Sequence, residues 1–144
     1  MTGLVARAEV EIAAPPGAVW KALTDPDCIR QYFLGSVVET DWQPGSPITW
    51  SGEYNGTSYQ DKGEILEVQQ DHLLVLTHFS PTSGQPDRPE NYHRLSYRLE
   101  ERAGRTLLTL TQDNNSSDLE VEHSTSTWQS TLDSLKGLVE SSSP

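Results

Sequence analysis

The chain has 144 residues, and its 10 Lys and Arg stand against 21 Asp and Glu, which gives a formal net charge of −11. Such an excess disfavours contact with the phosphates of nucleic acids and with anionic membrane surfaces, and it favours solubility. The single cysteine, Cys28, excludes an internal disulfide and a zinc site built from cysteines.

The chain start lacks a basic segment followed by an apolar core, so we expect no signal peptide. No apolar run approaches the roughly 18 residues that a membrane span requires. We therefore predict a soluble, cytoplasmic protein. Residues 1–140 are expected to form a single domain, and residues 141–144 a flexible tail.

The N-terminal part predicts one strand and two short helices. Apolar and polar residues alternate over Val5–Ile12, as in a strand with one buried face. Pro15-Pro16 favours the first turn of a helix that ends near Thr24-Asp25-Pro26. Asp25 then caps a second short helix, which has Pro26 in its first turn and ends at Gly35.

The middle of the chain predicts strands joined by turns. Asn55-Gly56 between two apolar segments is a strong hairpin signal, and Ser80–Glu90, with three prolines and a glycine, predicts a loop. The expected strands are Ser36–Thr40, Ile48–Tyr54, Thr57–Val68, Leu73–Phe79, Asn91–Glu100 and Thr106–Gln112.

The C-terminal part predicts one long helix. Ser117 and Glu120 have the spacing of a capping box, and apolar residues then recur every three or four positions over roughly 22 residues. We expect an α+β fold in which a curved antiparallel sheet of about six or seven strands wraps around this helix. The two short helices after the first strand would close one end and leave an internal cavity.

This organisation resembles the START-like, or SRPBCC, superfamily with its helix-grip fold, and within it the family of activator-of-heat-shock-ATPase homologues. The stretches that carry the resemblance are Val19–Pro26, Tyr32-Phe33, Asp41–Ser46, Gly63–Val68, Leu74–His78 and the apolar positions of the last helix. The family often has an aromatic residue at the position of His78 and a histidine at that of Gln112. Both positions are expected to face the interior, so the lining of this cavity differs from the usual one.

The side chains expected to face the cavity follow from strand parity. A two-residue turn at Asn55-Gly56 places Trp50 opposite Asp61, and the last hairpin places Tyr97 opposite Leu110. Tyr32 and Phe33 follow the second short helix at the expected mouth of the cavity, where they could stack on a ligand or pack as a lid. Trp128 lies on the periodic apolar stripe of the long helix, which favours a place in the core over a ligand contact. The predicted ligand-binding residues are Tyr32, Phe33, Trp50, Tyr59, Asp61, Leu76, His78, His93, Tyr97, Leu110, Gln112 and Trp128.

His78 and His93 flank the proline-rich loop, so their imidazoles are expected to lie close together at one end of the cavity. They could anchor a polar ligand group or act as a general base, or they could simply bond to water and backbone at the rim of the sheet. Asp61 could orient a ligand or bond to an indole or a tyrosine hydroxyl. We assign no catalytic residue, metal or cofactor, because no motif or histidine spacing supports one.

Three functions remain open at this point. The favoured one is binding of a small, largely apolar molecule with a lipid-like or aromatic body. A second, implied by the resemblance, is a stress-related accessory role with a chaperone or another protein as partner. A third is a cyclase- or hydrolase-type enzyme that uses His78, His93 or Asp61 to carry protons.

Overall fold

Seven antiparallel strands form one sheet in the order β1-β7-β6-β5-β4-β3-β2. The computed structural model describes residues 3–33, 35–54, 56–81 and 84–142. The strands are β1 (Leu4–Ile12), β2 (Val37–Glu39), β3 (Pro47–Tyr54), β4 (Thr57–Gln69), β5 (Leu73–His78), β6 (His93–Arg102) and β7 (Arg105–Asn115). The helices are α1 (Pro16–Thr24), α2 (Pro26–Tyr32), α3 (Asp118–Ser142) and the 3₁₀ turn η2 (Pro89–Asn91).

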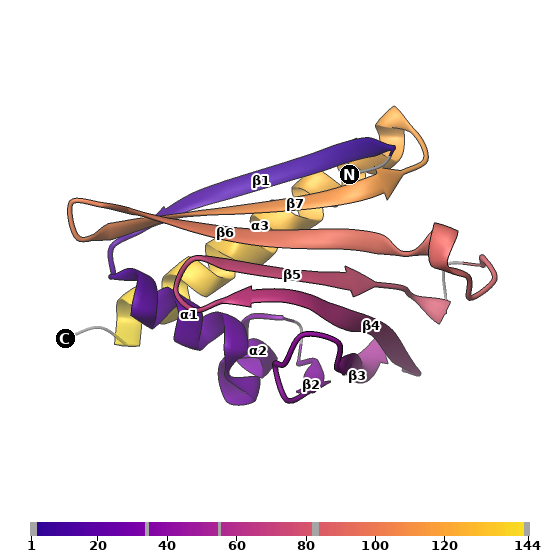
Figure 1. Cartoon of the computed structure of the whole chain (residues 1–144), viewed down its shortest axis with the longest axis horizontal. Coiled ribbons are helices and arrows are strands. Elements are labelled where there is room, and N and C mark those ends of the chain that lie inside the picture. The colour runs from indigo at the N-terminus through magenta and orange to yellow at the C-terminus, as the bar shows by residue number, and fades with distance from the viewer. Residues whose placement is uncertain (1–2, 34, 55, 82–83, 143–144) are drawn as a thin grey trace.

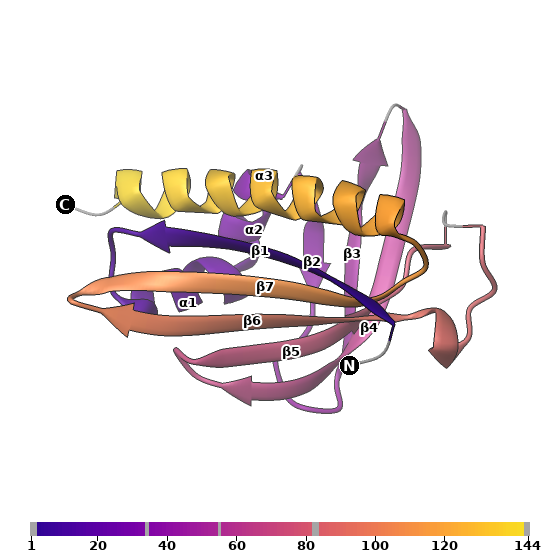
Figure 2. The ribbon, with the colours of Figure 1, turned by 90° about the horizontal axis from the view of Figure 1, so that it is seen from above.

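The long helix α3 lies along β1 and β7 on one face of the sheet, and α1 and α2 lie near its C-terminal half (Figures 1 and 2). The sheet bends strongly, so that β3 and β4 stand away from β1 and β7 when seen from above (Figure 2). The predicted α+β helix-grip fold, with two short helices after the first strand, is confirmed.

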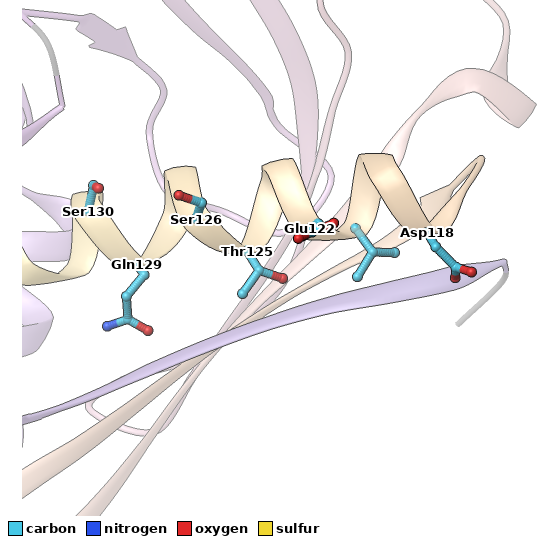
Figure 3. A pocket seen from close by; sticks show the side chains of 7 residues that line it. Asp118, Glu122, Thr125, Ser126, Gln129 and Ser130 are labelled. Carbon is cyan, nitrogen blue, oxygen red and sulfur yellow. The ribbon is translucent and has the colours of Figure 1, made fainter.

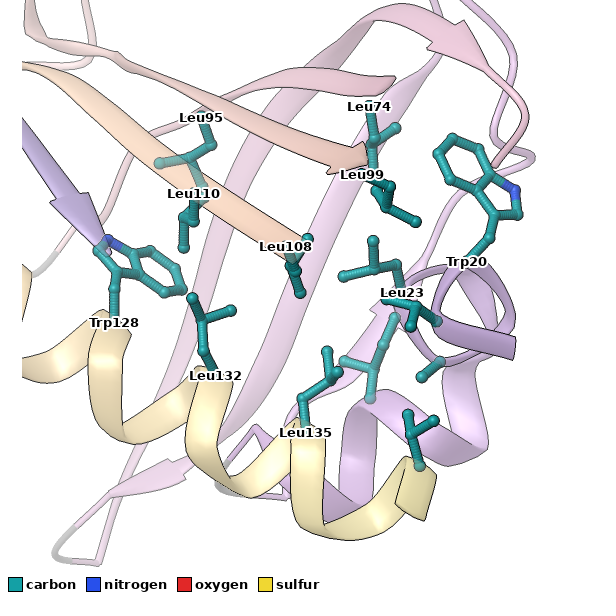
Figure 4. Close-up of a cluster of buried hydrophobic side chains, with 14 of the residues drawn as sticks. Trp20, Leu23, Leu74, Leu95, Leu99, Leu108, Leu110, Trp128, Leu132 and Leu135 are labelled. Atoms are coloured by element: carbon teal, nitrogen blue, oxygen red, sulfur yellow. The ribbon is translucent and has the colours of Figure 1, made fainter. Parts of the chain in front are cut away.

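The apolar stripe of α3 forms one wall of the core. Trp128, Leu132 and Leu135 point from α3 toward Leu108 and Leu110 of β7 (Figure 4). All five side chains are buried. The predicted helix is therefore confirmed, and burying this stripe contributes about 1.5–3 kcal/mol for each large apolar side chain.

Only one of the two hydrogen bonds of the expected capping box forms at the start of α3. The Glu120 amide donates to Ser117 Oγ at 3.1 Å, but the Glu120 carboxylate accepts from the Ser116 amide at 2.9 Å rather than from Ser117. At its other end α3 reaches Ser142, for a length of 25 residues. It thus includes the first half of the expected tail, whose residues 143–144 lie outside the described part.

The predicted registers are confirmed. Tyr54 pairs with Thr57 across the expected turn, whose Asn55 lies outside the described residues, and Trp50 pairs with Asp61. The other predicted partners, Tyr97 with Leu110 and His78 with His93, also face each other.

Most strand ends differ from expectation by one to three residues, and two of these differences have a clear cause. β6 begins two residues later than predicted because Pro89 starts the turn η2, where a proline suits the first position. β7 runs three residues past Gln112, because its end still pairs with Leu4 of β1. Residues 82–83 of the predicted loop lie outside the described part.

Gln112 joins the sheet to α3 through a buried polar network. Its Oε1 accepts from Trp128 Nε1 at 2.7 Å, and its Nε2 donates to Asn115 Oδ1 at 2.9 Å and to Ser124 Oγ at 3.1 Å. Gln112, Asn115 and Ser124 are all classed as buried. Both ends of the amide are thus paired, which is what a polar group in a core requires.

Gly63 allows β4 to approach β5 more closely than any residue with a side chain would at this position. A Cβ built on Gly63 would lie 1.7 Å from the Thr77 carbonyl oxygen. Beside it, the backbones of Lys62 and Phe79 exchange two hydrogen bonds of 3.0 Å and 2.7 Å. This close approach brings Asp61 next to His78.

Replacing Gln112 with Leu should lower the free energy of unfolding by about 2–4 kcal/mol, because inside the core Trp128 Nε1 loses its acceptor and Ser124 Oγ loses the hydrogen bond that it accepts from Gln112. Urea unfolding measures the change. Gln60→Leu is the control, since Gln60 is exposed and makes one hydrogen bond to Ser51. Adding Trp128→Phe to Gln112→Leu should cost less than the sum of the single changes. If the changes in free energy of unfolding from the two single substitutions simply added, the result would contradict the network.

Gly63→Ala should lower the free energy of unfolding by about 3 kcal/mol or more, because the strands must separate to admit the methyl group. Gly137→Ala is the matched control. Gly137 lies in α3 with nothing within 4 Å of its built Cβ, so alanine there should stabilise by up to about 1 kcal/mol. Equal effects of the two changes in thermal unfolding would contradict the close approach at Gly63.

Candidate functional site

A small, partly open cavity lies between α2 and the inner face of the sheet. Its volume is about 20 Å³, which is room for roughly one water molecule. Among the described residues, none that lines it is charged, and half of those that do are aromatic. The lining residues are Leu23, Ile29, Tyr32, Phe33, Trp42, Ile48, Trp50, Leu74, Leu76 and Tyr97.

Five of the twelve predicted ligand-binding residues lie together in this lining, namely Tyr32, Phe33, Trp50, Leu76 and Tyr97. They come from three parts of the fold, α2 with its end, β3, and the paired strands β5 and β6. Strand parity and the position of the short helix were therefore sufficient to gather one continuous apolar surface.

The other predicted residues have partners elsewhere. Leu110 and Trp128 belong to the core against α3, where the ring of Phe33 meets Trp128 edge-on at 5.7 Å. The side-chain amide of Gln112 already forms the hydrogen bonds of the network described above. Tyr59 lies over Gly52, and its hydroxyl is 2.6 Å from Ser36 Oγ.

The five lining residues that were not predicted are Leu23, Ile29, Trp42, Ile48 and Leu74. Leu74 has the same strand parity as Leu76, and Ile48 the same as Trp50, so parity could have found both. Leu23 and Ile29 lie on the apolar faces of the short helices. Nothing in the pattern points to Trp42, which lies between two strands.

Trp42 enters the lining through an unusual backbone conformation. Its φ is 60°, in the left-handed region that bulky residues rarely adopt. The Trp42 amide donates to Thr40 Oγ1 at 3.3 Å, and the Gln43 amide donates to Asp41 Oδ1 at 3.0 Å. Hydrogen bonds from Ser46 and from the Gln43 amide lower the pKa of Asp41. These local bonds hold the loop in the strained conformation.

Asp61 and His78 form a close pair beside the cavity. His78 Nε2 lies 2.9 Å from Asp61 Oδ2, and the two side chains are 19% and 18% exposed. The imidazole packs edge-on against the Trp50 ring at 5.1 Å. Trp50 lines the cavity and neither Asp61 nor His78 does, so the indole separates the pair from the cavity. The pair could transfer a proton, but Trp50 lies between it and any ligand in the cavity.

His93 is the strand partner of His78 but is bound to another part of the sheet. Its Nδ1 lies 2.8 Å from the Asp113 carbonyl oxygen, which can only accept, so Nδ1 donates. Asp113 Oδ1 accepts from the Arg94 amide at 2.6 Å. Within the described residues, no group of three or more His, Cys, Asp or Glu is arranged to hold a metal ion.

An open groove of about 700 Å³ runs along α3. Figure 3 shows mainly polar side chains along it, among them Asp118, Glu122, Thr125 and Gln129. This open groove lacks the apolar enclosure typical of small-molecule sites. The smaller cavity between α2 and the sheet is therefore the better candidate.

Burial raises the pKa of the Tyr97 phenol well above its ordinary value. It does the same for Tyr32, to which Tyr97 and Cys28 add an unfavourable interaction with the ionised form. Burial also raises the pKa of the Cys28 thiol, with Asp25 adding to the effect, so this thiol is not activated as a nucleophile. At physiological pH both phenols remain neutral hydrogen-bond donors.

The raised pKa of Tyr97 predicts a loss of stability in base. Unfolded tyrosine ionises near pH 10, whereas the folded chain keeps this proton to higher pH. Unfolding therefore releases a proton above about pH 10, and the free energy of unfolding falls as pH rises. Tyr97→Phe should reduce this fall between pH 9 and 11 in urea unfolding. A difference from the native chain that stays constant over this pH range would contradict the prediction.

Comparison with known proteins places these features in a family. Residues 13–140 match the family described as "Activator of Hsp90 ATPase homolog 1-like protein". No curated protein sequence matched the chain. None of the helices in the described part is long and apolar enough to cross a membrane.

Solved structures agree with this match. The solution structure of ChR145 from Cytophaga hutchinsonii is 40% identical, with a TM-score of 0.86 over 99% of this chain and 97% of that one. The Aha1 dimer from Colwellia psychrerythraea is 20% identical, with a TM-score of 0.74 over 95% and 96%. DynU16, a protein in the dynemicin biosynthetic locus, is 20% identical with a TM-score of 0.79, over 97% of this chain and 48% of that one. The chain described here belongs to the family of Activator of Hsp90 ATPase homolog 1-like proteins, within the SRPBCC superfamily.

Proposed function

We propose that this protein binds a small, largely apolar molecule in the cavity between α2 and the sheet. The observation that carries the proposal is the composition of the cavity wall, which has ten uncharged residues, five of them aromatic. Sites for small molecules are enclosed and mostly apolar, with few polar groups, and this wall has that composition. The structural relative DynU16 comes from a biosynthetic locus, which is consistent with a small organic ligand.

Binding requires the cavity to enlarge, because about 20 Å³ holds no more than a water molecule. Trp42 is the wall residue most ready to move. It is partly exposed, lies in a loop rather than in a strand or helix, and has a strained φ of 60°. Strain of this kind is released when the residue leaves its position. We therefore assign Trp42 as the residue that covers the cavity in the free protein.

A second candidate function is an accessory role toward a heat-shock ATPase. The family description and the relationship to the Aha1 dimer favour it. The charge of −11 would then attract a basic surface of the partner. A third candidate, cyclase- or hydrolase-type catalysis, depends on the Asp61–His78 pair, which Trp50 separates from the cavity.

Titration of ¹⁵N-labelled protein with lipids, flavonoids and polyketides tests the proposal. A ligand should shift the amides of Leu23, Ile29, Leu74 and Leu76 and leave those of the outer face unchanged. Association, followed by tryptophan fluorescence, to which Trp50 in the cavity wall contributes, should be slower than about 10⁵ M⁻¹s⁻¹ because a wall must move first. Trp42→Ala should accelerate association about tenfold.

Gln43→Ala is the matched control, since it changes an exposed neighbour in the same loop and leaves the indole in place. Equal association rates for the two variants would overturn the role of Trp42. If no compound moved the cavity amides while the protein stimulated a heat-shock ATPase, the second candidate function would replace the first.

A further inference from the structure

Two phenol groups stand out in the otherwise apolar wall of the cavity. Tyr32 extends from the last turn of α2, and Tyr97 from the middle of β6. They are the only hydroxyl-bearing residues among the ten that line the cavity. Both residues line the same small cavity, so a single small ligand there would be within reach of both side chains.

Neither hydroxyl forms a hydrogen bond with another of the residues that the structure describes. The tyrosine hydroxyls that form hydrogen bonds within the described residues are those of Tyr59 and Tyr92. Among the described side chains, the fully buried polar atom without a partner is Thr111 Oγ1, on the opposite face of the sheet beside Arg7. Tyr32 and Tyr97 therefore keep their hydroxyls in contact with space that a water molecule can enter.

The polar groups of the cavity wall are mainly hydrogen-bond donors. Trp42 and Trp50 carry indole N–H groups, which only donate, and neutral phenols are good donors. Because burial raises the pKa of both tyrosines, the phenols keep their protons at physiological pH. Among the described residues, no side-chain carboxylate, amide or imidazole lines the cavity to accept a hydrogen bond or to balance a charge.

We propose that the ligand is an uncharged, flat aromatic molecule whose carbonyl-type oxygen accepts hydrogen bonds from Tyr32 and Tyr97. This inference rests on the proposed function and specifies its ligand class. Aromatic rings suit a wall in which Phe33, Trp42 and Trp50 offer faces and edges. An oxygen that only accepts suits the two phenols, which an apolar ligand would leave unpaired. A charged ligand would lose its hydration with nothing in the wall to replace it.

Fluorene and 9-fluorenone test this inference, because they share one flat skeleton and differ in a single carbonyl oxygen. Affinities for the full chain are measured by calorimetry. The native protein should bind fluorenone more tightly than fluorene. Tyr32→Phe and Tyr97→Phe should each weaken fluorenone binding about threefold to tenfold and change fluorene binding less than twofold. Near-ultraviolet circular dichroism checks that each variant is folded.

Tyr92→Phe is the matched control. The Tyr92 hydroxyl already donates to Asp87 on the outer face, so its loss should change neither affinity. If both probes bind but each tyrosine variant affects them equally or not at all, the inference is overturned while the proposed function stands. If neither probe nor any compound of the earlier panel binds, the proposed function and this inference are both overturned.

Discussion

The packing of α3 against the sheet is the constraint on which the rest of the structure depends. An antiparallel sheet with one solvated face must cover the other, and α3 is the only described helix long enough to do so. Apolar contacts from Trp128, Leu132 and Leu135 supply the attraction (Figure 4). The hydrogen bond from Trp128 to Gln112 fixes the position of α3 along the sheet, because a shift of the helix by one turn would leave the Trp128 N–H and the Gln112 oxygen unpaired in the core.

The cavity is a consequence of how far α3 reaches. Its apolar stripe covers β7 and neighbouring strands, but the sheet bends away toward β3 and β4 (Figure 2). The short helix α2 and the loop of Trp42 cover that remainder. Seven residues of helix and one strained loop make a weaker cover than α3 does. The protein therefore has a rigid side, where the side-chain amide of Gln112 is fully hydrogen-bonded. It also has an adaptable side, where the hydroxyls of Tyr32 and Tyr97 form no hydrogen bond with another described residue.

Much of this could be predicted from the sequence, because period-two alternation and the Asn-Gly turn determine which side chains share a face. They correctly predicted the pair Trp50–Asp61, and symmetric pairing about the proline-rich loop correctly predicted His78 opposite His93. Parity indicates the face of a residue but not its partner, so Gln112 and Trp128 were expected at a ligand and instead bind each other. Trp42 was missed because loop geometry with a positive φ leaves no mark in a periodic pattern. The separation of His78 from the cavity depends on the packing of Trp50, which only three-dimensional structure reveals.

The position of β1 has a consequence for how the molecule is made. The first strand pairs with the last, so that Leu4 lies opposite Asn115, and its end is joined to α3 where the Ala13 amide donates to Glu140. During synthesis, the N-terminal strand emerges from the ribosome long before its neighbour exists. The sheet can be completed only when nearly the whole chain is available, and pairing over such a separation is slow because the intervening chain must first lose its freedom. Until then the apolar face of β1 stays uncovered on the nascent chain, which makes this period the one in which the protein is most exposed to aggregation and most in need of a chaperone.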